Sequence, residues 1–156
     1  MLGRTFPKRD FPILRNGKSK HNYQGNPEEW KKFANKLRTT KKKNWKLVVA
    51  PGYKHNQKIH AGDILIHQGK KGPGHVMIAI DIPKKIKGQL GVEIADSTSM
   101  PKYHDKRSWY NQKTKKKATG MGTGVIHLRN EKNVLQMEKH KNAKEWKDLY
   151  VIRPVS

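Results

Sequence analysis

The sequence predicts an α+β domain in which one short helix packs against a sheet of five or six antiparallel strands. Residues 27–38 carry apolar side chains at the spacing of a helical face, and several short runs rich in Val and Ile follow them. Turns containing Pro, Gly or Lys separate those runs, as expected for antiparallel neighbours. A chain of 156 residues is long enough for one domain with a single modest core.

The helix is predicted within a polar N-terminal segment, residues 1–45. At its start, the Asn-Pro-Glu-Glu run at 26–29 supplies an N-cap, a proline suited to the first helical position and two carboxylates that favour the positive end of the helix dipole. The apolar face consists of Trp30, Phe33, Ala34 and Leu37. This stripe predicts packing against the sheet rather than ligand binding.

The remaining residues, 46–156, are predicted to form the β-sheet domain. Its candidate strands are 46–50, 62–67, 75–82, 91–96, 122–129, 134–138 and 149–154. The run HVMIAIDI at 75–82 is apolar at nearly every position, which predicts a central strand covered on both faces. The polar stretch 99–121 predicts a long loop, and such loops often have a functional role.

Charge is the strongest compositional signal. Lys and Arg number 35 against 12 Asp and Glu, so the formal net charge is +23. Such a chain attracts polyanions, whether nucleic acid, teichoic acid or anionic lipid headgroups. The lysines are spread along the whole chain, however, and the sequence has none of the common nucleic-acid-binding motifs. Both a merely solubilising surface and a polyanion-binding face therefore stay open.

Two absences from the sequence exclude further classes of protein. No apolar run approaches the roughly 20 residues of a membrane-spanning helix, so no integral membrane segment is predicted. The chain has no Cys, which excludes disulfides, thiolate metal sites and a cysteine nucleophile within it.

The stretch from residue 62 to residue 99 carries the residues best suited to chemistry. A tight turn at 70–74 presents His75 at the mouth of a buried strand, where a general base is held by the sheet yet accessible from solvent. Asp96 ends the next predicted strand. If the two strands pair, Asp96 can hold the proton of one ring nitrogen, which is the base-and-orienter half of a nucleophile–His–acid triad.

Three motifs in this stretch carry a family resemblance: GDILI at 62–66, GHV-I at 74–78 and ADSTS at 95–99. Together they resemble the NlpC-type cell-wall peptidases and amidases of the papain-like superfamily, over residues 45–156. The resemblance implies a papain-like half with a barrel-like antiparallel sheet. It also implies a catalytic role for His75, an orienting role for Asp96, and a peptidoglycan-like peptide or another amide as substrate, with no cofactor.

The later part of the chain is similar to a subgroup of that family. It has the Asp-Ser-Thr segment, a His-x-x-Arg loop at 104–107, a Gly-x-Gly-x-Gly turn at 120–124 and a closing YVIRP strand. The residues expected to contact substrate are His67, Ser97, Thr98, His104, Arg107 and Trp109. An aromatic residue in such a loop could equally serve to anchor the loop.

The absent nucleophile is the main departure from the family. Its members carry a Cys at the start of a helix, where the helix dipole lowers the thiol pKa. The helix predicted at 27–38 has no Cys, Ser or Thr in its first turn. We expect an N-terminally incomplete domain, or else a degenerate member without hydrolytic activity. The first case predicts a cell-envelope or secreted protein, and a complete chain predicts a cytoplasmic one. The alternative function is a non-catalytic basic module that binds nucleic acid or another polyanion.

Several of these residues also have purely structural interpretations. His75 could be a core histidine bonded to a backbone carbonyl, and Asp96 could cap its strand or hold the following turn. Asp63 is expected to stabilise a turn. Arg107 beside Asp105 predicts an exposed ion pair within the loop, worth under about 1 kcal/mol.

Two other patterns do not lead to a ligand site. A zinc site is not expected, because the chain has no HExxH motif and no paired short spacing of ligands. The residues weighed for it are His67, His104 and His127 together with His75 and Asp96. The glycines at 120–124 are not expected to bind phosphate, because a strand rather than a helix follows them. Close backbone approach at the start of that strand is the better interpretation.

Overall fold

The computed structural model describes residues 27–67, 74–98, 100–107, 110–111, 116–117 and 120–155. Within these ranges the chain is mostly antiparallel sheet with one short helix, so the predicted α+β class is confirmed. No helix in the described part of the chain is both long and apolar enough to span a bilayer. Trp109 and the turn residues 70–73 lie outside the described residues.

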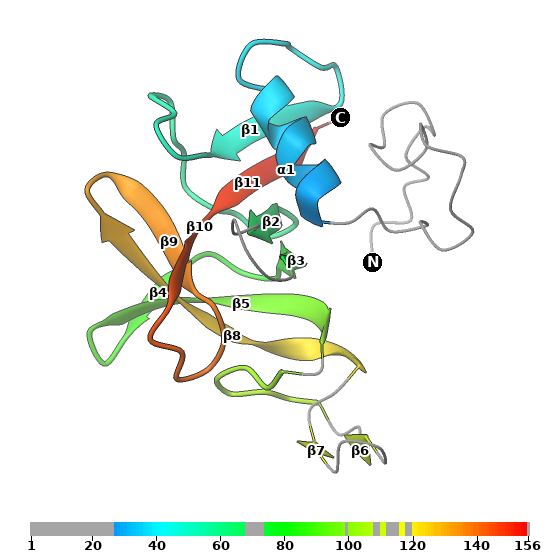
Figure 1. The fold of residues 1–156 in the computed structure, drawn as a ribbon, viewed down its shortest axis with the longest axis vertical. Helices are drawn as coiled ribbons and strands as arrows, with labels where there is room; N and C mark the ends of the chain where they lie inside the picture. The colour runs from blue at the N-terminus through cyan, green and yellow to red at the C-terminus, as the bar shows by residue number, and fades with distance from the viewer. Residues whose placement is uncertain are drawn as a thin grey trace.

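The helix α1 runs from Pro27 to Lys36, slightly shorter than predicted. It lies against the sheet and contacts β2, β3 and β11 (Figure 1). Trp30 and Ala34 are buried on its inner face, and the Trp30 and Phe33 rings meet the Trp45 ring edge-on at centroid distances of 6.1 and 5.6 Å. The apolar stripe is therefore a packing face, as the spacing predicts.

Nine strands form the main sheet. They are β1 (Trp45–Val49), β2 (Ile64–His67), β3 (His75–Ala79), β4 (Lys84–Ile86), β5 (Gln89–Thr98), β8 (Gly120–Glu131), β9 (Val134–Glu138), β10 (Trp146–Asp148) and β11 (Tyr150–Pro154). A separate two-stranded sheet comprises β6 (Tyr110–Asn111) and β7 (Lys116–Lys117).

The order along the main sheet is β1-β11-β2-β3-β5-β8-β9-β10, with β4 paired to β5, and every pairing is antiparallel. The sheet has more strands than the five or six predicted. All seven candidate segments contain a strand, and β4 and β10 are additional because these short, polar strands have no apolar run to reveal them. The sheet is also not closed: β1 and β10 stand at opposite ends of the order. The expected barrel-like closure is therefore not observed in the described chain.

The expectation for 75–82 is only half correct. The strand β3 is central, because it pairs with β2 on one side and β5 on the other. It ends at Ala79, however, and Ile78 is 50% exposed, so it is not covered on both faces. Helix α1 reaches Val76 but not Ile78, which leaves the end of this face open.

Two hydrophobic clusters stabilise the fold. One lies on the face of the sheet away from α1 and includes Leu65, Met77 and Ile94, all nearly inaccessible. The other lies between α1 and the sheet. Beneath the first cluster, the Asp63 carboxylate accepts hydrogen bonds from the His60 backbone N–H at 2.8 Å and from Arg153 Nε at 2.7 Å. The turn-stabilising interpretation of Asp63 is thus confirmed.

Candidate active site

The site lies on the face of the sheet away from α1, where the apolar side chains of the first hydrophobic cluster give way to polar ones. Side chains alternate along a strand, so His75 shares the face of buried Met77, and Asp96 shares the face of buried Ile94. Both therefore point toward the first hydrophobic cluster, at its open end. His67 pairs directly with His75 across β2 and β3 and joins the same face.

His75 and Asp96 are in direct contact. The Nε2 atom of His75 lies 2.6 Å from Oδ2 of Asp96, and the Asp96 side chain is fully buried while that of His75 is 22% exposed. The predicted contact between these side chains is confirmed. The described partner of His75 is a carboxylate, not the backbone carbonyl of the alternative interpretation.

Asp96 is held in turn by two cations from the segment 100–107. Arg107 Nη2 donates to Oδ1 of Asp96 and, at 3.1 Å, to its backbone carbonyl, while Lys102 Nζ lies 3.6 Å from Oδ2. Arg107 Nη1 also donates to Asp105. The expected pair with Asp105 is therefore present, but it is buried rather than exposed. The described contacts of Arg107 fix Asp96 rather than line an open cleft.

Two glycines on β8 make room for these cations. Gly122 pairs with Asp96, and a Cβ atom at Gly122 would overlap Cγ of Arg107. A Cβ at Gly124 would lie 2.5 Å from Cβ of Lys102. The close-approach interpretation of the glycine run is therefore confirmed, and the glycines are what allow a buried charge network at this position.

The environment keeps both histidines neutral. Burial, followed by the charges of Lys102 and Arg107, lowers the pKa of His75 to about 4. Burial, followed by His75 and Lys102, lowers the pKa of His67 to about 4 as well. Asp96 does not hold His75 protonated, because its charge is already matched by the two cations. Burial also lowers the pKa of Lys102.

A neutral His75 has a defined pair of ring nitrogens. Because an ionised carboxylate can only accept, Nε2 must carry the proton and donate it to Asp96. This leaves the Nδ1 lone pair as the position from which His75 can accept a proton. The arrangement is chemically a base whose tautomer and orientation are set by a carboxylate.

The other candidate residues divide into three groups. His67 lies beside the pair: its ring is 6.3 Å from that of His75, it is buried, and its Nδ1 has no hydrogen-bond partner in the part of the chain that the structure describes. Thr98 shares the face of Asp96 and accepts the Met100 N–H at 3.0 Å, whereas exposed Ser97 points to the opposite face. His104 is also separate, in a pocket described below.

Sequence reasoning missed Lys102, which had no motif to mark it. The available signal was indirect: a Gly-x-Gly strand that pairs with the strand carrying Asp96 leaves space that a long side chain must fill. Among the described residues, no group of three or more His, Cys, Asp or Glu side chains is arranged to hold a metal ion. His104 and His127 line a pocket on the other face of the sheet, away from His67 and His75.

Comparison of the chain with family models, curated proteins and solved structures finds no match in any of the three.

Proposed function

We propose that this chain carries the base-and-orienter half of a papain-like, NlpC-type thiol hydrolase site that acts on peptide or amide bonds of peptidoglycan-like substrates. The observation that carries the proposal is the 2.6 Å contact between Nε2 of His75 and buried Asp96. A histidine that binds its carboxylate through Nε2 presents Nδ1 to a nucleophile and a substrate. The His75 side chain is 22% exposed, so the ring is not sealed from solvent.

In this proposal His75 acts first as a base and then as an acid. It accepts the thiol proton at Nδ1 and returns it to the leaving amine, while Asp96 keeps Nε2 protonated throughout. Arg107 and Lys102 are positioning residues, because they touch Asp96 and not the reacting atoms. The low pKa of His75 describes the chain without a thiolate, and a thiolate facing Nδ1 would raise it.

The nucleophile is the part that this sequence lacks. The chain has no Cys, Thr98 already accepts a backbone N–H, and Ser97 faces away from Asp96. The chain alone is therefore expected not to hydrolyse amides. A thiol supplied by residues outside this sequence would complete the site.

Substrate recognition is tested first, with the chain as it is. A peptidoglycan stem tetrapeptide is titrated against the labelled protein, and the imidazole signals of His67 and His75 are followed by NMR. We expect saturable changes at both rings that persist in high salt and are lost in His75→Ala. The matched control is His55→Ala, an exposed histidine outside the site. Binding that is unchanged in His75→Ala would contradict the proposal.

The chemistry is tested by joining a Cys-bearing helix to the N-terminus of the chain. Amide hydrolysis should then require the Cys, and His75→Ala should lower it by roughly 10²- to 10⁴-fold, the usual contribution of a general base. Robust turnover by the Cys-free chain would contradict the assignment of the missing nucleophile.

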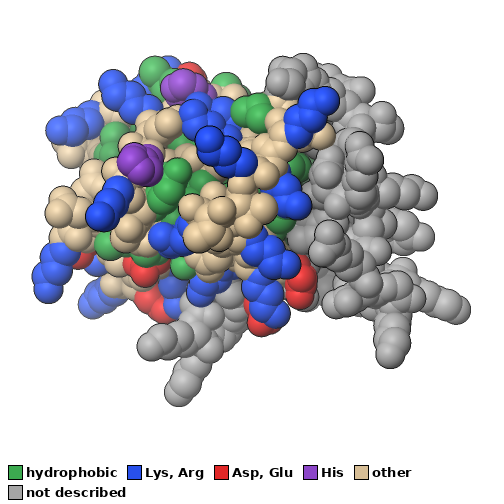
Figure 2. Space-filling model, turned by 90° about the horizontal axis from the view of Figure 1, so that it is seen from above, with side chains coloured by type: hydrophobic (Ala, Val, Ile, Leu, Met, Phe, Trp, Pro, Cys, Tyr) green, Lys and Arg blue, Asp and Glu red, His purple; other side chains and the backbone are tan. Residues whose placement is uncertain are grey.

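A second candidate function rests on the charge of +23. Figure 2 shows Lys and Arg side chains over much of the visible face rather than in one stripe. In this alternative the chain is a non-catalytic module that binds nucleic acid or another polyanion without sequence preference. Its affinity should fall steeply with salt, because bound lysines release counterions, and should not change in His75→Ala.

A further inference from the structure

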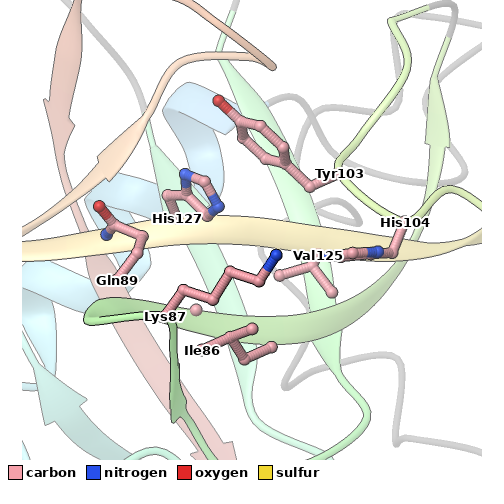
Figure 3. Close-up of a pocket in the computed structure, with 8 residues that line it drawn as sticks. Ile86, Lys87, Gln89, Tyr103, His104, Val125 and His127 are labelled. Carbon is pink, nitrogen blue, oxygen red and sulfur yellow. The ribbon is translucent and has the colours of Figure 1, made fainter.

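The face of β5 and β8 that points away from the His75–Asp96 pair contains a pocket of about 280 Å³. Its floor is formed by Gly91 and Val125, which alternate with the buried core residues of the same strands. Its walls come from the β4–β5 hairpin and from the segment 100–107 (Figure 3). It is therefore separate from the candidate active site.

A glycine keeps the pocket open. A Cβ atom at Gly91 would lie 3.0 Å from Cγ1 of Val125 and 3.9 Å from Cδ2 of His127, inside the space that the pocket occupies. The backbone of Gly91 has no positive φ that would itself require glycine. Glycine at this position thus leaves space for the pocket and is not required by a turn conformation.

The lining of the pocket is cationic. Lys87, His104 and His127 contribute nitrogen atoms, and none of the described residues that line the pocket carries a carboxylate. Figure 3 shows the Lys87 side chain extending across the floor toward Val125, with the two histidines on either side. An anionic group in the pocket would meet only donors or potential donors from these three side chains.

The carboxylates that neighbour the lining residues are engaged by other groups: Glu93, which pairs with Val125 of the floor, lies 3.0 Å from Lys106 Nζ, and Glu138 contacts the wall residues Tyr103 and His127. Glu138 Oε1 accepts a hydrogen bond from the Tyr103 hydroxyl at 3.1 Å, and Oε2 lies 3.3 Å from Nδ1 of His127. The Tyr103 and His127 rings stack at 3.7 Å, which fixes the orientation of the imidazole. Glu138 therefore contacts His127 and Tyr103 but is not itself one of the residues that line the pocket.

We propose that this pocket binds a small organic anion, whose carboxylate or phosphate group lies between Lys87 and the two histidines and whose apolar body contacts Ile86 and Val125. Ile86 is 48% exposed at the pocket, so it offers apolar surface that a ligand would cover. The volume is at the lower end of the range for small-molecule sites, which suits a single ring or a short chain.

The test uses the full chain and two probes, benzoate and phenyl phosphate, with neutral benzamide as the comparison. Calorimetry and NMR at physiological salt should show one saturable site for at least one anion, with signal changes at Lys87, Tyr103 and His127. The two probes distinguish a carboxylate ligand from a phosphate ligand. Failure of both anions to bind, or equal binding of benzamide, would overturn the proposal.

Three variants distinguish the pocket from diffuse surface charge. Lys87→Asn, in which Asn tolerates the positive φ of 50°, should weaken anion binding by about tenfold or more. Lys85→Asn, an exposed lysine of the same hairpin outside the lining, should have little effect. Gly91→Leu should abolish binding by filling the floor. Equal losses in the two lysine variants, or full binding by a folded Gly91→Leu variant, would overturn the proposal.

Discussion

The described chain holds two histidine–carboxylate pairs on opposite faces of the main sheet, one on β3 and β5 and the other on β8 and β9, and they differ in what fixes them. In one, His75 binds Asp96 at 2.6 Å, and Asp96 is anchored by Arg107 and Lys102. In the other, His127 lies 3.3 Å from a Glu138 oxygen that has no hydrogen-bond partner among the described residues, and its ring is held by stacking on Tyr103.

The difference shows that a carboxylate near a histidine does not by itself fix the orientation and tautomer of the imidazole. Burial and the nearby charges of Lys102 and Arg107 together keep His75 neutral. The same two cations neutralise Asp96, which accepts the ring proton and so defines the tautomer of His75. Glu138 meets no such cations in its described hydrogen bonds, so it serves to orient a pocket wall. The positions of Lys102 and Arg107 therefore matter as much as the histidine itself.

The largest effect is expected when the anchor of Asp96 is removed. Arg107→Met leaves a buried carboxylate without its main partner and should lower the free energy of unfolding by about 3–5 kcal/mol. The control is Lys106→Met, which breaks only the exposed ion pair with Glu93 and should cost under about 1 kcal/mol. Chemical denaturation measures both. Equal small losses would mean that the Asp96 network contributes little to stability.

The next effect concerns pH. The pKa of His75 is lowered from 6.5 to about 4 in the folded chain, so the unfolded chain binds the additional proton between these values. Its contribution is fully present above pH 6.5 and is lost as the pH falls toward 4, by up to roughly 3 kcal/mol. Denaturation at several pH values measures the slope.

The same pKa can be observed directly by NMR titration of the His75 imidazole. We expect a midpoint near 4 that rises in Lys102→Met, because that substitution removes a nearby cation. A midpoint above 6.5 would contradict this account and would mean that the charge of Asp96 outweighs both burial and the two cations.

A smaller effect is expected from the space that glycine leaves. Gly122→Ala places a methyl group on Cγ of Arg107, and the required shift should destabilise the fold by about 1–3 kcal/mol. Met121→Ala is the neighbouring control, because Met121 is 68% exposed and should change stability by less than about 0.5 kcal/mol. Thermal unfolding compares the two, and a neutral Gly122→Ala would contradict the close approach.

The smallest effect belongs to the second pair. Tyr103→Phe keeps the stack on His127 but removes the hydroxyl that bonds Glu138 at 3.1 Å and accepts the Asn142 N–H at 2.9 Å. The expected loss is about 1 kcal/mol, with no change in the His75 titration. A shift of the His75 midpoint in this variant would show that the two faces are coupled through the segment 100–107.

Much of the local structure could be predicted because its causes are local. The spacing from Trp30 to Leu37 indicated the helix, and strand alternation with two neighbouring strands brought His75 to Asp96. The strand β4 escaped prediction because Lys84–Ile86 has no apolar pattern and is stabilised by its pairing with β5. The exposure of Ile78 was not predicted for the opposite reason. An apolar run predicts a buried strand, but it does not reveal how much of that strand a helix covers.

The sequence by itself determined the absence of a cysteine, the excess of positive charge, the helix and the histidine and aspartate at the ends of adjacent strands. Tertiary structure alone decided that Arg107 and Lys102 are buried against Asp96, because that burial depends on Gly122 and Gly124 in a strand distant in sequence. It also decided that the other face holds an open pocket. Burying a charged side chain costs free energy unless opposite charges and sufficient space are present at the same position, and only the packed sheet supplies both.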